Sequence, residues 1–341
     1  MILIFGFLGS LAWAQSVDEL PLNIEQTLEE SPVQAPLTQA DLLDEGVALR
    51  RVGAFDDAEA MLRQASRMGE GLGDQVQYQL GVLHEVQERW SQAIEVYASL
   101  VEQWPEGETA PDARFRRAYC LEELGLHKEA IQAVKALQVD GQWSEDDSRT
   151  MHLQRGITEI GVGRERKGIR RILKHLSSGK DDRTWIRAKA RLALVRAQTH
   201  TAKEVVLKGD KKAARRLKQR AALISAAEKQ AIVMFNLGEP EFALEGLLML
   251  GDAYLQLYED MLSYPPPRSI APADQEAYRQ AVKQEAGILK AKAHARYDEG
   301  VRVAARTQWV GSVTQRLIAK RDATLDVGAM DQPSASPEEM P

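Results

Sequence analysis

Six histidines and many carboxylates are the side chains of this sequence whose chemistry could support catalysis or metal binding. No two histidines stand four residues apart with a glutamate between them, the spacing by which a helical zinc hydrolase holds its metal. The spacings of a nucleophile elbow and of a phosphate-binding loop are also missing. Carboxylate pairs such as Glu122 and Glu123 lie on helical patterns, where they are usually solvated. We therefore expect no enzymatic activity, no metal site and no cofactor. The histidines are His84, His127, His152, His175, His200 and His294.

The chain of 341 residues has one cysteine, Cys120, so an internal disulfide is impossible. Its neighbours in the sequence are apolar. A thiol in such surroundings is hard to ionise, and we expect Cys120 to be an inert core residue.

Charge is distributed unevenly along the chain, although the net charge is only -6. Residues 15–163 carry a net charge of -16, residues 164–220 carry +15, and residues 221–341 carry -5. An excess of this size needs anions nearby, because like charges repel within a Debye length of about 8 Å. Four compensating groups are open: acidic groups of the chain itself, an acidic protein or glycan, lipid phosphate, or nucleic acid. The basic patch comprises Arg166, Arg170, Arg171, Lys174, Lys211, Lys212, Arg215 and Arg216.

The first fourteen residues are uncharged and largely apolar, and they end in Ala12, Trp13 and Ala14. The apolar run is too short for a transmembrane helix, which needs roughly 20 residues, and small residues flank Trp13 as a signal peptidase requires. We interpret residues 1–14 as a signal peptide cleaved after Ala14, and expect a periplasmic or otherwise exported protein. The lysine or arginine that usually precedes the apolar run is missing, so the true start could lie upstream of Met1.

Two polar segments border the central part of the chain. Residues 15–39 are acidic and interrupted by prolines, and residues 322–341 are similarly polar. Neither segment has a sustained apolar period, so both are predicted to be disordered.

Between these segments the apolar pattern is helical and it repeats. Small residues recur at Gly46, Gly81, Ala118 and Gly156, at intervals of 35, 37 and 38 residues. Each can let two helix backbones approach closely, and in the first three units an alanine follows where the second helix should pack: Ala58, Ala93 and Ala130.

This pattern resembles the tetratricopeptide repeat, which has a period of about 34 residues and places a small residue, a turn, an alanine, an aromatic and a closing proline in that order. The resemblance implies an all-α fold: a right-handed superhelical solenoid of antiparallel helix hairpins, with longer C-terminal helices. We expect four hairpins over 40–178 and longer helical repeats over 179–264, including the basic segment and a repeat-like helix at 240–263. A proline break and capping helices should follow over 265–321. An ordinary helical bundle is the alternative.

In a tetratricopeptide array the first helix of each hairpin lines a concave groove. By resemblance, the groove positions here are Arg50, Tyr78, Val82, Glu85, Phe115, Tyr119 and Glu122. Its aromatic and charged groups could hold a peptide, although Tyr78, Phe115 and Tyr119 could equally be packing residues.

Two functions follow from these features. The first is a non-enzymatic scaffold of the bacterial cell envelope, because the C-terminal part also resembles repeat proteins of that compartment. Such a scaffold would bind a protein or peptide in the groove, and we expect the partner to be an envelope component. The second is a cytoplasmic or surface protein that binds nucleic acid through residues 164–220, which export would exclude.

Overall fold

The computed structural model describes residues 36–69, 71–140, 143–176, 183–207, 212–266, 270–309 and 311–325. The expected signal peptide, most of the N-terminal segment and the tail beyond Leu325 lie outside these residues. By its internal contacts the chain divides into two units, Met1–Thr38 and Gln39–Pro341, and the second contains all the helices described below.

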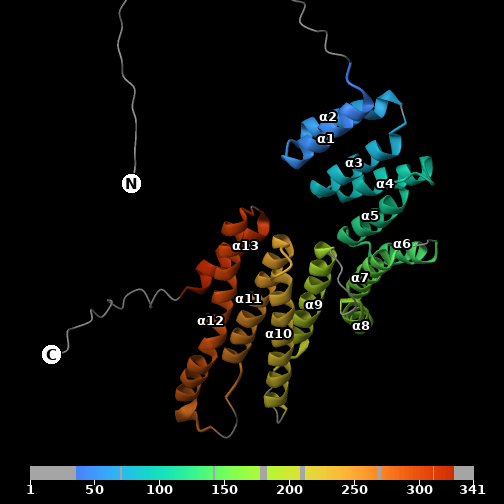
Figure 1. Ribbon diagram of the computed structural model, residues 1–341. Coiled ribbons are helices and arrows are strands. Elements are labelled where there is room, and N and C mark those ends of the chain that lie inside the picture. The colour runs from blue at the N-terminus through green and yellow to red at the C-terminus, as the bar shows by residue number, and fades with distance from the viewer. Residues whose placement is uncertain are drawn as a thin grey trace, which may run out of the picture. The chain divides into compact units, whose positions relative to one another are not determined.

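Every regular element in the described residues is helical, which confirms the all-α prediction (Figure 1). The helices are α1 (Gln39–Arg51), α2 (Phe55–Met68), α3 (Gly73–Val86), α4 (Trp90–Gln103), α5 (Ala110–Glu123), α6 (His127–Asp140), α7 (Glu145–Gly161), α8 (Glu165–Leu176), α9 (Thr184–Glu204), α10 (Ala213–Phe235), α11 (Pro240–Leu262), the 3-10 turn η1 (Pro272–Asp274), α12 (Gln275–Thr307) and α13 (Ser312–Thr324).

Short turns separate the two helices of each early hairpin. Gly53, with φ 82°, lies between α1 and α2, and Gly125, with φ 80°, lies between α5 and α6. A positive φ costs glycine little, so the backbone can reverse within three residues. Glu88 holds the corresponding place between α3 and α4 with φ 56°, a conformation that side-chain-bearing residues rarely adopt.

The helices stack as successive antiparallel hairpins, which makes the fold an all-α solenoid as predicted. Each helix packs against the next along the chain, and the odd-numbered helices also contact one another in order from α1 to α13. We call this row the inner row. It consists of the first helix of each hairpin, followed by α13, and no contact joins two even-numbered helices among the described residues.

Close packing inside the hairpins depends on glycine at two corresponding places. A side-chain carbon added to Gly81 would collide with the ring of Tyr97, and one added to Gly251 would collide with the ring of Tyr297. Both tyrosine side chains are fully buried. The sequence pattern predicted that Gly81 faces Ala93; the ring one turn further along α4 is the nearer neighbour, because a tyrosine reaches across the space that a glycine leaves.

The pair Gly251 and Tyr297 shows that α11 and α12 form a hairpin of the same kind. In α3 and α4, Gly81 is followed by Ala93 and then Tyr97; in α11 and α12, Gly251 is followed by Ala293 and then Tyr297. Gly251 and Ala293 are farther apart in the sequence than Gly81 and Ala93, because α11 and α12 are longer than α3 and α4 and a proline-containing segment lies between them. The long helix α12 therefore supplies the second helix of a repeat.

At both ends of the solenoid the helices extend into segments expected to be disordered. Gln39 begins α1, where its amide donates a hydrogen bond to the carbonyl oxygen of Ala65 at 3.0 Å. At the other end α13 continues to Thr324, past the expected boundary at 322, because Thr324 is buried and hydrogen-bonds to His294 at 3.1 Å.

Candidate functional site

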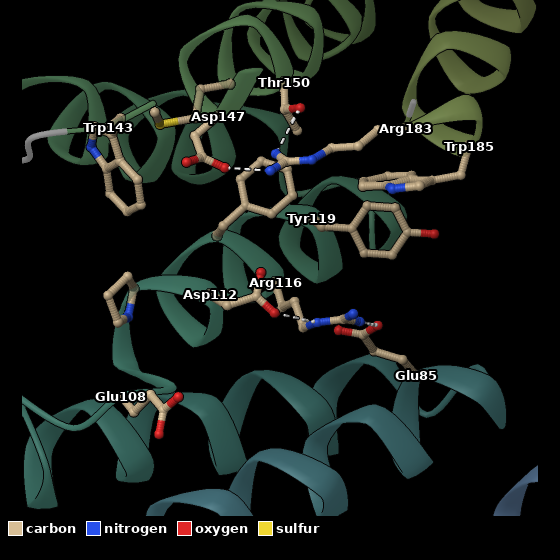
Figure 2. A pocket seen from close by; sticks show the side chains of 13 residues that line it. Glu85, Glu108, Asp112, Arg116, Tyr119, Trp143, Asp147, Thr150, Arg183 and Trp185 are labelled. Atoms are coloured by element: carbon tan, nitrogen blue, oxygen red, sulfur yellow. Dashed lines mark hydrogen bonds and ion pairs between the residues drawn. The ribbon is translucent and has the colours of Figure 1, made fainter. Parts of the chain in front are cut away.

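A cavity of about 530 Å³ lies along the inner row, between α5, α7 and the start of α9 (Figure 2). We call it the aromatic pocket, because Phe115, Tyr119, Trp143 and Trp185 form much of its wall. The side chains that line it are Glu85, Glu108, Pro111, Asp112, Phe115, Arg116, Tyr119, Trp143, Asp147, Thr150, Met151, Arg183 and Trp185.

The aromatic rings of the pocket support one another edge to face. The ring centroid of Trp185 lies 6.3 Å from that of Phe115 and 5.9 Å from that of Tyr119. Tyr119 in turn lies 6.0 Å from Trp90 on α4. Such contacts fix ring orientation at distances typical of favourable aromatic pairs. The pocket therefore offers a rigid apolar wall made from α5 and α9, and Trp90 of α4 supports Tyr119 from outside the pocket.

The charged groups of the pocket are arranged in two clusters (Figure 2). Arg116 contacts the Glu85 carboxylate at 2.7 Å and the Asp112 carboxylate at 3.0 Å. Arg183 contacts Asp147 at 2.6 Å and donates to the hydroxyl of Thr150 at 3.2 Å. Counting the exposed Glu108, four carboxylates face two guanidinium groups, so the pocket carries an excess of negative charge.

Burial changes the pKa values of two groups near Arg116, Glu85 and Cys120. Burial raises the pKa of Glu85, although Arg116 opposes the shift. Burial also raises the pKa of Cys120, and the nearby Glu85 carboxylate, which accepts a hydrogen bond from the thiol at 3.5 Å, adds to the effect. A buried thiol with a raised pKa is a poor nucleophile, in keeping with a structural role.

A second cavity, of about 310 Å³, continues along the inner row. We call it the acidic pocket, because five glutamates line it beside apolar residues that include Phe242 and Trp309: Glu88, Glu122, Glu123, Glu241 and Glu245. Burial raises the pKa of Glu241, and the like charges of Glu123 and Glu88 raise it further. The cations on its wall are Lys189, Arg196 and Arg316.

Lys189 joins the two pockets. Its ammonium group lies 2.6 Å from Glu122, 2.5 Å from Glu123 and 3.8 Å from the ring centroid of Tyr119. Lys189 and Glu122 are only 6% and 7% exposed. This buried ion pair ties α9 to α5, and it separates an aromatic section of the groove from an acidic one.

The structure places the groove residues predicted from the sequence in three different surroundings. Glu85, Phe115 and Tyr119 line the aromatic pocket, and Glu122 lines the acidic pocket. The other three line neither. Tyr78 hydrogen-bonds to Asp112 and receives a 2.7 Å hydrogen bond from Arg116, Val82 is buried, and Arg50 contacts Gln79 at 3.4 Å.

Sequence reasoning missed pocket residues that lie later in the chain, on α7 and α9 and in the segments just before them: Trp143, Asp147, Arg183, Trp185 and Lys189. A period of small residues locates helix hairpins, but it does not show which side chains of one hairpin meet those of the next.

The basic patch is divided between two helices that do not touch. Arg166, Arg170, Arg171 and Lys174 lie on α8, whereas Lys212, Arg215 and Arg216 lie at the start of α10, and Lys211 falls outside the described residues. Both helices pack against α9. Some of the α8 charge is compensated within the chain, because Glu159 of α7 lies 3.0 Å from Arg171 and 3.4 Å from Lys167.

Two further features concern metals and membranes. In the described ranges, no three histidine, cysteine, aspartate or glutamate side chains are grouped as a metal ion requires. None of the helices there combines the length and apolar character needed to cross a bilayer.

Comparison with known proteins found a family model and a solved structure that are similar to this chain. A family model described as tetratricopeptide repeat matches residues 43–108. A solved tetratricopeptide repeat protein from Parabacteroides merdae ATCC 43184 is 16% identical, with a TM-score of 0.40, and the match covers 84% of this chain and 99% of that one. No curated protein matches this sequence.

Repeats of this family generally mediate protein–protein interaction. The matched residues extend from α1 to the segment after α4, and the hairpins beyond them stack by the same helix contacts. Residues 43–108 are thus similar to the tetratricopeptide repeat family, as the sequence pattern predicted.

Proposed function

We propose that this protein is a non-enzymatic interaction scaffold of the bacterial cell envelope, and that it binds a peptide or protein segment along the inner row. The observation that carries the proposal is the aromatic pocket: an apolar wall of Phe115, Tyr119, Trp143 and Trp185 beside oriented charges. Buried aromatic anchors supply most of the affinity at protein interfaces, and surrounding charges supply orientation.

The charge of the groove favours a partner segment with basic and apolar side chains. Carboxylates outnumber cations in both the aromatic and the acidic pocket. A lysine or arginine can lay its apolar stem along an aromatic wall while its charged head reaches a carboxylate. An acidic segment would meet repulsion along the same path.

A peptide array tests this partner chemistry. Synthetic segments that combine aromatic or aliphatic residues with lysine or arginine should bind the full chain, and charge-reversed versions of the same segments should not. Equal binding of both sets would contradict the proposed partner chemistry.

Two matched substitutions locate the binding. Phe115→Ala should weaken capture of the basic segments, whereas Phe235→Ala should not, since Phe235 is also a half-buried phenylalanine but lies outside both pockets. Glu108→Lys should weaken binding more than Glu106→Lys, because both glutamates are exposed and only Glu108 lines the aromatic pocket. Equal effects within each pair would place the binding elsewhere.

The envelope location is supported by the apolar run and small residues of segment 1–14. Intact-mass measurement of the protein from its native cells tests it, and the expected mature chain begins at Gln15. A full-length protein in the cytosol would contradict export and would reopen nucleic acid as a partner of the basic helices.

A further inference from the structure

A third cavity, of about 250 Å³, lies between one face of α9 and one face of α11, with a side chain of α10 in its wall. Its α9 face presents Arg196, Thr199, His200 and Lys203, which are spaced three and four residues apart as on one side of a helix. Arg220 of α10 also lines it. Small side chains, among them Ala253, leave the space open. We call this the basic cavity.

Arg220 is held in a fixed position at this cavity. Its side chain is only 2% exposed, and its Nη1 lies 2.5 Å from Oδ2 of Asp260. The other carboxylate oxygen of Asp260, Oδ1, accepts a 3.0 Å hydrogen bond from the Gln256 amide. The Nε of Arg220 has no acceptor within the part of the chain that the structure describes. Asp260 balances the charge of Arg220 but does not engage all five N–H donors of the arginine guanidinium.

The remaining charges of the basic cavity do not cancel. Its one carboxylate, Asp252, is already engaged at 2.8 Å by Lys320 and at 2.8 Å by the hydroxyl of Tyr297. Arg196 and Lys203 have no ion pair within the described residues, although Arg196 also borders the acidic pocket. Two positive charges at this cavity therefore lack a counterion.

We infer that the basic cavity binds a phosphate group. A phosphate monoester carries about -1.5 to -2 charges at neutral pH, which matches the two uncompensated cations. Guanidinium groups suit its oxygens because their donors form a planar fork, and an ammonium adds a point charge. Thr199 of α9 and Gln256 of α11 also line the cavity, where the Thr199 hydroxyl donates to the Val195 carbonyl oxygen at 2.9 Å and the Gln256 amide donates to Asp260 at 3.0 Å. The inference does not rest on the groove function, although Arg196 lines both this cavity and the acidic pocket.

The test measures binding of inorganic phosphate and of glycerol phosphate to the full chain by isothermal titration calorimetry. Saturable binding at one site is expected. Arg196→Gln combined with Lys203→Gln should weaken it by at least roughly tenfold, since hydrogen bonds to charged groups contribute about 1.5–3 kcal/mol each and 1.4 kcal/mol is tenfold. Both side chains are exposed, so the fold should persist, and circular dichroism verifies this.

The matched control is Arg166→Gln combined with Arg170→Gln on α8. These two arginines are also exposed and without an ion pair in the described ranges, and their loss changes the net charge equally. Affinity should be unchanged in this control. Equal weakening in both double variants would mean diffuse electrostatic attraction and would overturn the inference, as would the absence of saturable binding to every phosphate probe.

A further arm distinguishes the source of the phosphate group. Vesicles of phosphatidylglycerol are compared with vesicles of neutral lipid. Binding to the anionic vesicles that fails only in the cavity double variant assigns a lipid headgroup, and binding of the free phosphates alone assigns a soluble ligand. Vesicle binding that both double variants lose equally counts against the cavity.

Discussion

The helices α1–α8 and the helices α9–α12 build the same kind of hairpin at different lengths. The first group has helices of 12 to 17 residues, and the second has helices of 21 to 33. In the short-helix region the apolar core is divided into small clusters. In the long-helix region one cluster includes residues from every helix from α9 to α13, among them Ala202, Ile224, Leu244, Ala293 and Leu317.

This difference explains the position of the aromatic pocket. Short hairpins bury their apolar faces locally, and bulky side chains then fill the spaces between neighbouring hairpins incompletely. The aromatic pocket occurs where the short-helix region meets α9, with Phe115 on one side and Trp185 on the other. The proposed binding surface coincides with the contact between α5 and α9, so substitutions at this contact should affect both stability and binding.

The largest effect is expected at the contact between α5 and α9. Lys189→Met removes the cation that balances Glu122, and Glu122 would remain almost fully buried without a partner. Loss of one member of a buried ion pair costs about 3–5 kcal/mol. Urea unfolding should show this loss of stability.

A double substitution serves as the control for this contact. Lys189→Met combined with Glu122→Leu should recover most of the loss, because apolar residues can replace a buried ion pair with little net cost. A single Lys189→Met variant as stable as the wild type would show that the pair does not hold α9 to α5.

The next prediction compares the two regions directly. Gly81→Leu and Gly251→Leu each force a side chain into a tyrosine ring and should destabilise the protein by about 1–3 kcal/mol. Scanning calorimetry would show whether the regions unfold together, in which case both variants shift the same transition, or separately, in which case each shifts its own.

Gly287→Leu on α12 is the control for both glycines. No atom lies within 4 Å of an added side-chain carbon there, and glycine disfavours helix by about 1 kcal/mol, so stability should stay equal or rise. Unchanged melting of Gly81→Leu would refute the packing assigned to the second hairpin.

An acid titration examines the charge on the last short hairpin. Burial by itself raises the pKa of Glu159, but the hydrogen bond and charge of Arg171, with Lys167 and Arg155, hold that pKa below its ordinary value. A depressed carboxyl pKa stabilises the fold above the unfolded-state pKa, and this contribution is lost as the pH falls through the folded-state pKa.

Glu159→Gln should therefore lose roughly 1.5 kcal/mol at neutral pH and approach the wild type in acid. Urea unfolding over a pH series measures the difference. Glu102→Gln, an exposed glutamate on α4 with no ion pair in the described residues, should follow the wild type throughout. A constant offset of Glu159→Gln at all pH values would disprove the electrostatic origin.

The smallest expected effects come from surface pairs in each region. Arg63 contacts Glu59 at 2.7 Å on α2, and Arg302 contacts Asp298 at 3.3 Å on α12; both arginines are more than half exposed. Arg63→Ala and Arg302→Ala should each cost about 0.3–0.5 kcal/mol, since solvent screens such pairs. If urea unfolding shows stability losses above 1 kcal/mol, surface ion pairs would contribute more than the extent of the apolar core to the difference in stability between the two regions.

Local sequence was sufficient to predict much of the fold. The spacing from Gly46 to Gly81, Ala118 and Gly156 predicted one hairpin per interval, because a tight helix pair needs a small residue and a short turn needs Gly53 or Gly125. The sequence also singled out Phe115 and Tyr119, two aromatic residues that line the aromatic pocket. Those features depend on neighbours within one or two turns of helix.

Only the tertiary structure decided which distant segments meet. It paired Gly251 with Tyr297 across the inserted helix extensions, brought Trp185 to Phe115, and buried Lys189 against Glu122. It also separated the basic residues of α8 from those of α10, although they belong to one basic stretch of sequence. The physical reason is that a repeat pattern specifies the packing within each hairpin, whereas contacts between hairpins depend on the angle and offset at which large side chains stack them.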